Sequence, residues 1–495
     1  MKHRIFDIRW IFYTFVSVFF VVFFTQVHPI VPYDGDDWLN IIIERPPYPW
    51  LDCWNPTKVL PECLEPLVAT AAGYLLVPLI GDYISSLIIA NALVVTIFIV
   101  VYLISVQQYL EWRFKLNWGA SLALMTIFIL SHLLILHSGD QGNEHLWYTN
   151  DANCYYHYII PNMLCASLVL WLMRHDIRTI RQGRTIATLL VLTYLALCSN
   201  LYSTVILIAY LGAVLVRDLF DTVKSSKRGP SVQTWLLAYV RRNVCFLTII
   251  VLWAIVQWIE ANGIRANAYG YMFQPLGYCL KVTLYNFLTI RYNLWFLLIS
   301  IFAILGAKIY DVTRRHSDFW HIGKWQSVVL LALGLSSSYL ILLSSRVDPL
   351  YIQRGDVIFE FAFFFLLLAI SSLAYLCRHI PQAIIPLPCL IVFMILQFNA
   401  PGKTFKDVMD IYEPDVQYCI DIDRNIVQQI CDADATGQDS VTIIVPRYPF
   451  GENWPVMSPR YASQYYGRAL YRHNQTKREI KTIFTEGALR PQFEE

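Results

Sequence analysis

The sequence has little charge for its length. Only 15% of its 495 residues are Asp, Glu, Lys or Arg, whereas a soluble domain carries roughly 25%. Hydrophobic residues make up 56% of the chain, and its mean hydropathy is +0.46. This composition excludes an ordinary soluble protein and indicates a polytopic membrane protein. The net charge of +2 is too small to suggest a nucleic-acid partner.

Metal-binding patterns are also missing. The chain contains 11 cysteines and 11 histidines, but they form no Cys-x-x-Cys or paired-His spacing, so we expect no metal and no cofactor. Cys53 and Cys63 share one predicted outer segment, and Cys419 and Cys431 share another. Either pair is compatible with a disulfide in an oxidising compartment or with two free thiols, and both interpretations stay open.

Long apolar runs dominate what is present. About eleven runs are long enough, or nearly so, to cross a hydrocarbon core of about 30 Å, which predicts an all-α polytopic fold. The Ser199-Asn200 break marks either a tight hairpin or one interrupted helix. Residues 67–80 are apolar but too short to span, and we expect a re-entrant or interfacial helix there. The expected spans are residues 11–27, 84–105, 118–137, 158–173, 186–198, 201–216, 244–260, 293–310, 326–343, 359–376 and 383–398.

The distribution of Lys and Arg predicts the orientation. These residues concentrate in one set of loops together with the N-terminus, which the positive-inside rule places in the cytoplasm. The first run lacks a small-residue cleavage site, so we interpret it as an uncleaved helix. With an odd number of spans, the C-terminus lies outside. The cationic set comprises Lys2, Arg4, Arg9, Arg113, Lys115, Arg174, Arg178, Arg181, Arg184, Arg217, Lys224, Lys227, Arg228, Arg241, Arg242, Arg314, Arg315, Lys324 and Arg378.

Two domains are expected. Residues 1–399 form the transmembrane domain, with an outer loop at 28–66 that is too long for a simple connector. Residues 400–495 are more polar and form a small outer α/β domain. Apolar residues have helical spacing between 421 and 432, and residues 441–445 are typical of a strand.

An acidic cluster follows the first span directly. Asp34, Asp36, Asp37 and Trp38 lie where the outer loop begins, and carboxylates so close to hydrocarbon are costly unless they face water, a cavity or a ligand. We interpret Asp36 as a catalytic base, with Asp37 orienting it, because neighbouring side chains of an extended segment point to opposite sides. The alternative is a solvated acidic loop or a helix cap.

Cations suited to a phosphate lie in other predicted outer segments. Arg346 and Arg354 are at the outer ends of consecutive spans, and a guanidinium binds phosphate through two hydrogen bonds. Lys58 in the first outer loop and Arg265 in a later one are further candidates. Each of them is equally compatible with an interfacial anchor that reaches for lipid headgroups.

Aromatic residues in the outer loops are candidates for stacking on sugars. These are Trp38 and Trp54 in the first outer loop, and Trp147 and Tyr148 in the second. An aromatic belt at the membrane interface would explain them without a ligand. Glu144 and His145 are either a second proton-handling pair or polar surface.

The motifs of the first outer loop resemble a known family. Asp34-Gly35-Asp36-Asp37-Trp38, followed by Trp54-Asn-Pro-Thr-Lys-Val-Leu-Pro-Glu62, is similar to O-antigen-modifying glucosyltransferases of the serotype-conversion (Gtr) type, and more broadly to the GT-C superfamily. The likeness covers roughly the first seventy residues. Related enzymes often have Gly-Arg where this chain has Thr57-Lys58, and lysine keeps the charge but lacks the planar fork of arginine.

The resemblance implies a GT-C-like fold and a metal-independent, inverting transfer. Glucose would pass from undecaprenyl-phosphate-glucose to the O-antigen repeat of lipopolysaccharide, on the periplasmic side of a bacterial inner membrane. It implies the role of base for Asp36 and Asp37 only. The partners would be the lipid-linked donor, a lipid-linked polysaccharide acceptor and membrane lipids.

Two alternatives remain open. One is transfer of another sugar to a different surface glycan or to teichoic acid. The other is a flippase or transporter for a lipid-linked sugar, whose polar residues would lie at mid-membrane in interrupted helices. The acidic cluster in an outer loop favours transfer.

Overall fold

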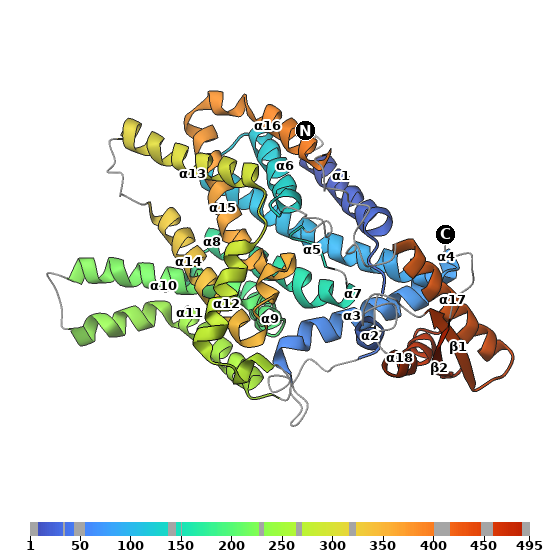
Figure 1. Cartoon of the computed structure of the whole chain (residues 1–495). Helices are drawn as coiled ribbons and strands as arrows, with labels where there is room; N and C mark the ends of the chain where they lie inside the picture. Colours follow the sequence, from blue (N-terminus) through green and yellow to red (C-terminus); the bar gives the residue numbers. More distant parts are fainter. Residues whose placement is uncertain are drawn as a thin grey trace.

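A computed structural model describes residues 8–32, 35–43, 55–136, 145–149, 151–226, 232–263, 270–315, 323–399, 416–446 and 459–487. It is a helical bundle with one small α/β unit (Figure 1). The helices are α1 (Ile8–Val22), α2 (Gly35–Asn40), α3 (Val59–Ala71), α4 (Val77–Ile80), α5 (Tyr83–Phe114), α6 (Trp118–Leu134), α7 (Ala152–Cys154), α8 (Ile160–Arg174), α9 (Gly183–Leu197), α10 (Thr204–Ser226), α11 (Val232–Ala261), α12 (Leu276–Thr289), α13 (Leu294–Arg315), α14 (Lys324–Val347), α15 (Gly355–His379), α16 (Leu387–Leu396), α17 (Val416–Ala435) and α18 (Pro459–Arg472); the strands are β1 (Ser440–Pro446) and β2 (Lys481–Gly487).

The chain is a multi-pass membrane protein. Within the described residues, eight helical segments are long and apolar enough to cross a membrane: Arg9–Val27, Pro56–Ile80, Tyr83–Phe114, Ala152–Arg174, Gln233–Ala261, Leu294–Arg314, Lys324–Val347 and Gly355–His379. Three shorter apolar helices, Trp118–Leu134, Gly183–Leu197 and Pro381–Leu396, coincide with further expected spans. The expected span at 201–216 corresponds to the first part of α10, which begins three residues later, at Thr204. At the Ser199-Asn200 break, α9 ends and α10 begins after a short turn.

Residues 67–80 are not a separate short helix, as the sequence suggested, because Pro56–Ile80 forms one continuous helical stretch of 25 residues. The re-entrant or interfacial position of this helix stays a prediction. A five-residue π-helical turn, Ala72–Leu76, joins α3 to α4. Glu62 and Glu65 interrupt the apolar run in the sequence, yet both side chains are buried.

Helix α5 is the centre of the bundle. Its 32 residues correspond to about 48 Å, longer than a hydrocarbon core of about 30 Å. It contacts α1, α3, α6, α8, α15 and α17. At its start the Asp82 side chain caps the helix by accepting a hydrogen bond from the Ser85 N–H at 2.9 Å. Helix α5 therefore connects the bundle to the C-terminal unit.

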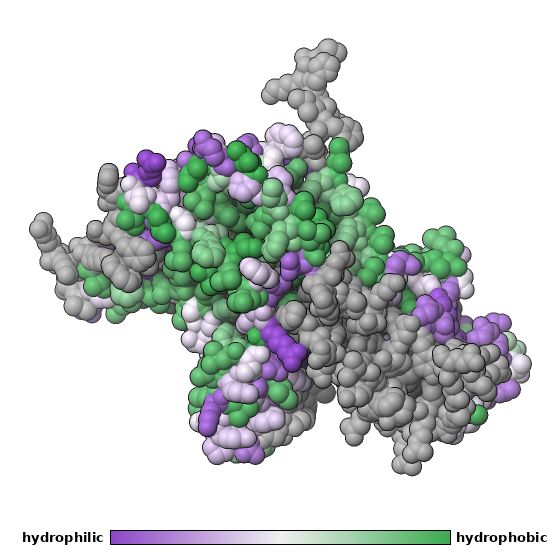
Figure 2. All heavy atoms as spheres, turned by 45° about the horizontal axis from the view of Figure 1, so that its top comes forward, coloured by the Kyte–Doolittle hydropathy of each residue, from purple (hydrophilic) through white to green (hydrophobic). Residues whose placement is uncertain are grey.

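The outer surface of the bundle is apolar. Figure 2 shows hydrophobic residues across the middle of the molecule, with hydrophilic residues gathered along the upper edge. Large side chains exposed on this surface include Phe15, Leu190, Trp258, Phe302 and Ile385. In water such an area would drive association, whereas lipid tails solvate it without cost.

The C-terminal unit is a parallel two-stranded sheet packed against two helices. β1 pairs with β2 from Ser440 opposite Lys481 to Pro446 opposite Gly487. α17 packs on β1 and α18 packs on β2. The expected helix and strand at 421–432 and 441–445 lie within α17 and β1. Cys431 and Cys63 are free thiols; the Cys419 side chain and Cys53 lie outside the described part of the chain. The unit lies beside α2 and α4 (Figure 1).

Candidate functional site

A cavity of about 730 Å³ lies between the helices of the bundle. Charged and amide side chains form one part of its wall, and α14 contributes Leu342, Leu343 and Val347 to the other. Segments far apart in sequence meet there, including α2, the turn before α3, the start of the α7–α8 helix, the α9–α10 turn, and the ends of α11 and α14. The polar and charged lining residues are Asp36, Asn40, Thr57, Lys58, Asp151, Asn153, His157, Asn200, Gln257, Glu260, Arg346 and Arg354.

Helix α2 gives the two neighbouring carboxylates different environments. Asp36 is exposed and lines the cavity. Asp37 is fully buried, and its carboxylate accepts backbone hydrogen bonds from Asn153 N–H at 2.7 Å and Ala152 N–H at 3.1 Å. Because these N–H groups begin a helix and have no partner within it, Asp37 caps that helix. Asn40 donates to the Asp36 carbonyl at 2.8 Å, so α2 presents Asp36 on a fixed turn.

The C-terminal unit packs against the far side of α2. Trp38 is fully buried and stacks on Tyr466 of α18, with ring centroids 3.8 Å apart. The Tyr466 hydroxyl donates to the buried Asp423 at 3.1 Å, and burial raises the pKa of that carboxyl well above its ordinary value. Arg472 donates to the Ile42 carbonyl at the end of the α2 segment. Trp38 therefore anchors the helix that carries Asp36 and does not line the cavity.

Contacts to the Ala72–Leu76 turn and to the start of α5 complete this interface. The Tyr83 hydroxyl lies 2.6 Å from His473 Nδ1, and Arg424 pairs with Asp82 at 3.1 Å. A Cβ at Gly73 would lie 2.5 Å from the His473 carbonyl oxygen, so only glycine permits this approach. The pKa of His473 is lowered to about 4, mainly by burial and to a smaller degree by the charge of Arg472, against a backbone hydrogen bond involving Ile41 that raises it.

Three of the four predicted cations line the cavity. Arg346 donates to the Gln274 carbonyl at 3.3 Å. Lys58 pairs with Glu62 one turn along the helix at 3.3 Å. Arg354 makes a two-point contact with Asp356, at 3.0 and 2.6 Å.

The setting of Arg354 is more enclosed than that of the other two. Its guanidinium lies 4.8 Å from the Tyr158 ring centroid and 5.2 Å from that of Tyr351. Asp356 is almost fully buried, so Arg354 compensates a buried charge as well as facing the cavity.

Two further carboxylates line the cavity. Burial raises the pKa of Asp151 above its ordinary value, Arg354 opposes the shift, and the negative charges of Asp356 and Asp36 add to it. Glu260, at the end of α11, accepts a hydrogen bond from the Thr57 N–H at 3.0 Å and so connects the first loop to the bundle. Sequence reasoning did not select either residue, because each is an isolated acid without a motif around it.

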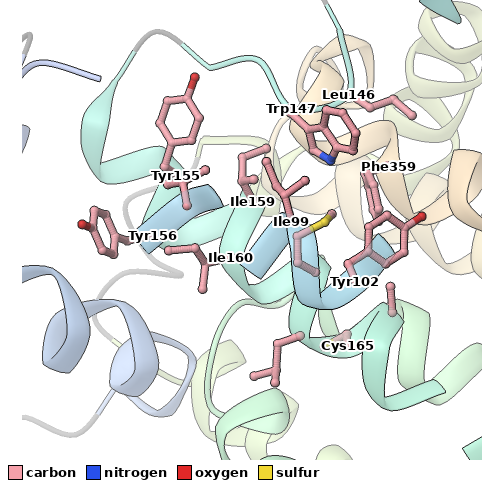
Figure 3. Packing of buried hydrophobic residues seen from close by; sticks show 14 of the residues in the cluster. Ile99, Tyr102, Leu146, Trp147, Tyr155, Tyr156, Ile159, Ile160, Cys165 and Phe359 are labelled. Carbon is pink, nitrogen blue, oxygen red and sulfur yellow. The ribbon is translucent and has the colours of Figure 1, made fainter. Parts of the chain in front are cut away.

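Residues 145–148 lie away from the cavity. Trp147 is fully buried and stacks on His132 at 4.5 Å between centroids; Figure 3 shows its ring in the apolar core near Tyr102 and Phe359. Tyr148 stacks on His28 at 5.1 Å, and His145 is buried beside Phe23 at 5.6 Å. We therefore assign Trp147, Tyr148 and His145 to packing. The same region reaches the cavity further on, through Asp151 and Tyr158.

The remaining predicted residues, Asp34, Trp54, Glu144 and Arg265, lie outside the described residues. Comparison of the chain with protein-family models, with curated proteins and with solved structures finds no match.

Proposed function

We propose that the chain is a membrane glycosyltransferase that moves glucose from undecaprenyl-phosphate-glucose to the O-antigen repeat of lipopolysaccharide, on the outer side of a bacterial inner membrane. One observation carries the proposal. Asp36 faces a cavity that Arg346, Arg354 and Lys58 also line, while its neighbour Asp37 is held in a helix cap. A base and several cations thus share one space. The specific sugar and acceptor rest on the resemblance of the first loop to O-antigen glucosyltransferases.

The reaction uses these groups as follows. The acceptor hydroxyl oxygen attacks C1 of the sugar from the face opposite the phosphate, and the C1–O bond to phosphate breaks. The electron pair of that bond goes to the phosphate oxygen, and the Asp36 carboxylate takes the acceptor proton. The configuration at C1 inverts. The phosphate of the carrier lipid gains negative charge as it leaves, and the guanidinium groups stabilise that charge.

The apolar wall of the cavity fits a lipid carrier. Leu342, Leu343 and Val347 line it along α14. On neighbouring α11, Ile255 and Trp258 are 48% and 68% exposed on the lipid-facing surface. A prenyl chain lying along this wall would place its phosphate near Arg346, at the end of α14. The polar wall, with Asn40 and Asn153, is left for the sugars.

Asp151 is the competing base. It lines the same cavity, and its raised pKa favours the protonated form more than that of an ordinary aspartate. We assign the base to Asp36 because its carboxylate is exposed and faces the cavity, whereas the half-buried Asp151 suits hydrogen bonding to a sugar hydroxyl. Replacing each by asparagine separates these roles. Asp36→Asn should lower kcat by about 10²–10⁴-fold, and Asp151→Asn should mainly raise the acceptor KM.

The whole proposal is tested by the chemistry of the cell surface. O-antigen from bacteria with and without the gene is compared by mass spectrometry and sugar analysis. The expected result is one additional glucose per repeat in cells that carry the gene, and its loss in cells that carry Asp36→Asn. Identical O-antigen in all three strains, with the protein present in the membrane, would contradict the proposal. A different added sugar, or addition to another glycan, would support the related transferase.

Transport of a lipid-linked sugar is the second candidate. The observation in its favour is that two glutamates lie buried within helices of the bundle, Glu65 at 2% and Glu360 at 0% exposure. Intramembrane carboxylates are typical of transport pathways. If the chain transports, purified protein in vesicles should move the lipid-linked sugar across the bilayer, and Glu360→Gln should stop it without any acceptor glycan present.

A further inference from the structure

A second group of cavities lies at the opposite end of the same helices. One of these cavities has a volume of about 400 Å³ and is lined by the N-terminal part of α14, including Lys324. Arg346, which lines the cavity that contains Asp36, is near the other end of α14. The 22 residues between them correspond to about 33 Å of helix, close to the thickness of a hydrocarbon core. This second site, which we call the basic cavity, is therefore a membrane thickness away from Asp36.

The lining of the basic cavity carries excess positive charge. Five cations line it, Arg113, Arg174, Arg178, Arg217 and Lys324, against two acids, Asp176 and Asp218. An adjoining cavity of about 500 Å³ shares Arg113, Lys324 and Trp325, and adds two cations, Lys115 and Arg378, and one acid, Asp311. Cations from α5, α8, α10 and α14 thus converge on one space.

The two acids neutralise only part of this charge. Asp218 is almost fully buried, and its carboxylate lies 2.9 Å from Arg178, 3.9 Å from Lys324 and 4.0 Å from Arg242. Asp176 also binds Arg178, at 2.7 Å. The shortest contact of each acid is therefore with the same residue, Arg178. Arg178 is further fixed by the Phe246 ring, 5.6 Å from its guanidinium carbon.

Arg174 and Arg113 are the cations without such compensation. Neither makes a hydrogen bond or ion pair with any residue in the described part of the chain; Arg113 is exposed, whereas the Nε atom of Arg174 is buried. The Nε atom of Arg217 is likewise buried without a described partner, although the same guanidinium lies 3.5 Å from Asp221. Burying guanidinium N–H groups without an acceptor is unfavourable. An anion in the cavity would supply the acceptors.

We propose that the basic cavity binds a phosphate group, with Arg174 and Arg113 as its principal ligands. Arginine pairs bind phosphate oxygens through several hydrogen bonds at once. The surroundings suit a phospholipid headgroup, because Trp112 is 44% exposed beside the cavity and Phe220 and Val223 of α10 are exposed near Arg217. Aromatic residues at this position are typical of headgroup depth. Inorganic phosphate has the same chemistry. This site goes beyond the proposed transfer reaction and does not depend on it.

The test uses the full-length protein purified in an uncharged detergent. Short-chain phosphatidylglycerol, phosphatidylcholine of the same chain length, and inorganic phosphate are titrated separately, and bound ligand is counted by native mass spectrometry. The double variant R113Q/R174Q removes the two principal ligands. R184Q/R181Q is the matched control, since it removes the same charge from exposed positions outside the cavity lining.

We expect the double variant to weaken phosphatidylglycerol binding at least tenfold, and the control to change it less than twofold. Binding of phosphatidylglycerol alone identifies a lipid headgroup. Saturable binding of inorganic phosphate that is lost in the double variant identifies a free phosphate. Equal loss in the control and the double variant, or no loss in either, would overturn the proposal and leave the cations as general determinants of orientation. Circular dichroism of each variant shows that a loss of binding is not a loss of fold.

Discussion

Replacing Asp37 by asparagine should destabilise the protein, whereas the same change at Asp36 should not. Asp37 accepts two backbone N–H groups, at 2.7 and 3.1 Å, at the start of the α7–α8 helix. Hydrogen bonds to a charged group contribute about 1.5–3 kcal/mol each. Asparagine keeps one acceptor but directs its NH2 group at the other N–H, so the expected cost is about 2–4 kcal/mol. Exposed Asp36 should change stability by less than about 0.5 kcal/mol.

The measurement is thermal unfolding in detergent, monitored through the reaction of buried thiols with a maleimide dye as they become exposed. Cys154 is buried in the helical turn that Asp37 caps, so it reports on this region directly. The expected outcome is a Tm lowered by several degrees for Asp37→Asn and unchanged for Asp36→Asn. Equal Tm values for the two variants would show that the cap does not stabilise the fold, and would remove the distinction between the two carboxylates.

Three other predictions concern the interface and the cations. Tyr466→Ala removes the 3.8 Å stack on Trp38 at a cost of about 3–5 kcal/mol, so proteases should release the C-terminal unit. Tyr466→Phe and Tyr471→Ala, the latter at an exposed site on the same helix, should leave the unit resistant to proteases. Release of the unit from all three variants would contradict this. His473 stays neutral when docked because its pKa is lowered from 6.5 to about 4, whereas the undocked histidine takes up a proton below pH 6.5. The histidine should therefore weaken docking as pH falls from 6.5 to 4, by up to about tenfold per pH unit. Asp423 and Asp82 also titrate at this interface, so His473→Gln should remove the histidine's part of the pH dependence, and an unchanged slope would refute it. Arg346→Ala should raise the donor KM while the amount of protein in the membrane stays normal. Arg354→Ala leaves Asp356 as a buried unpaired charge and should lower the amount of protein in the membrane. An unaltered donor KM in Arg346→Ala would show that Arg346 does not bind the phosphate.

Hydropathy was sufficient to predict most of the membrane helices. Runs of Leu, Ile, Val and Phe gave the positions of α5, α11, α13, α14 and α15, because burial in lipid depends on local composition. The same reasoning failed for Pro56–Ile80. Glu62, Glu65 and Pro66 interrupt its apolar run, but tertiary packing buries the two carboxylates and the helix continues through the proline.

The candidate site was predictable only in part. The acidic cluster identified α2, but the cap that separates Asp37 from Asp36 involves N–H groups more than one hundred residues further on. No local pattern contains that information. Trp38 and Trp147 are of a residue type that often stacks on sugars, but tertiary packing buries both of them. Asp151 and Glu260 reach the cavity only through the fold.

The most direct measurement of the central claim is sugar transfer by the purified Asp36→Asn protein. Radiolabelled undecaprenyl-phosphate-glucose and lipid-linked O-antigen are supplied to wild type and variant at equal folded concentrations in the same detergent. We expect kcat to fall by about 10²–10⁴-fold, as for loss of a general base, with the donor KM and Tm unchanged. A variant that keeps wild-type turnover would show that Asp36 is not the base.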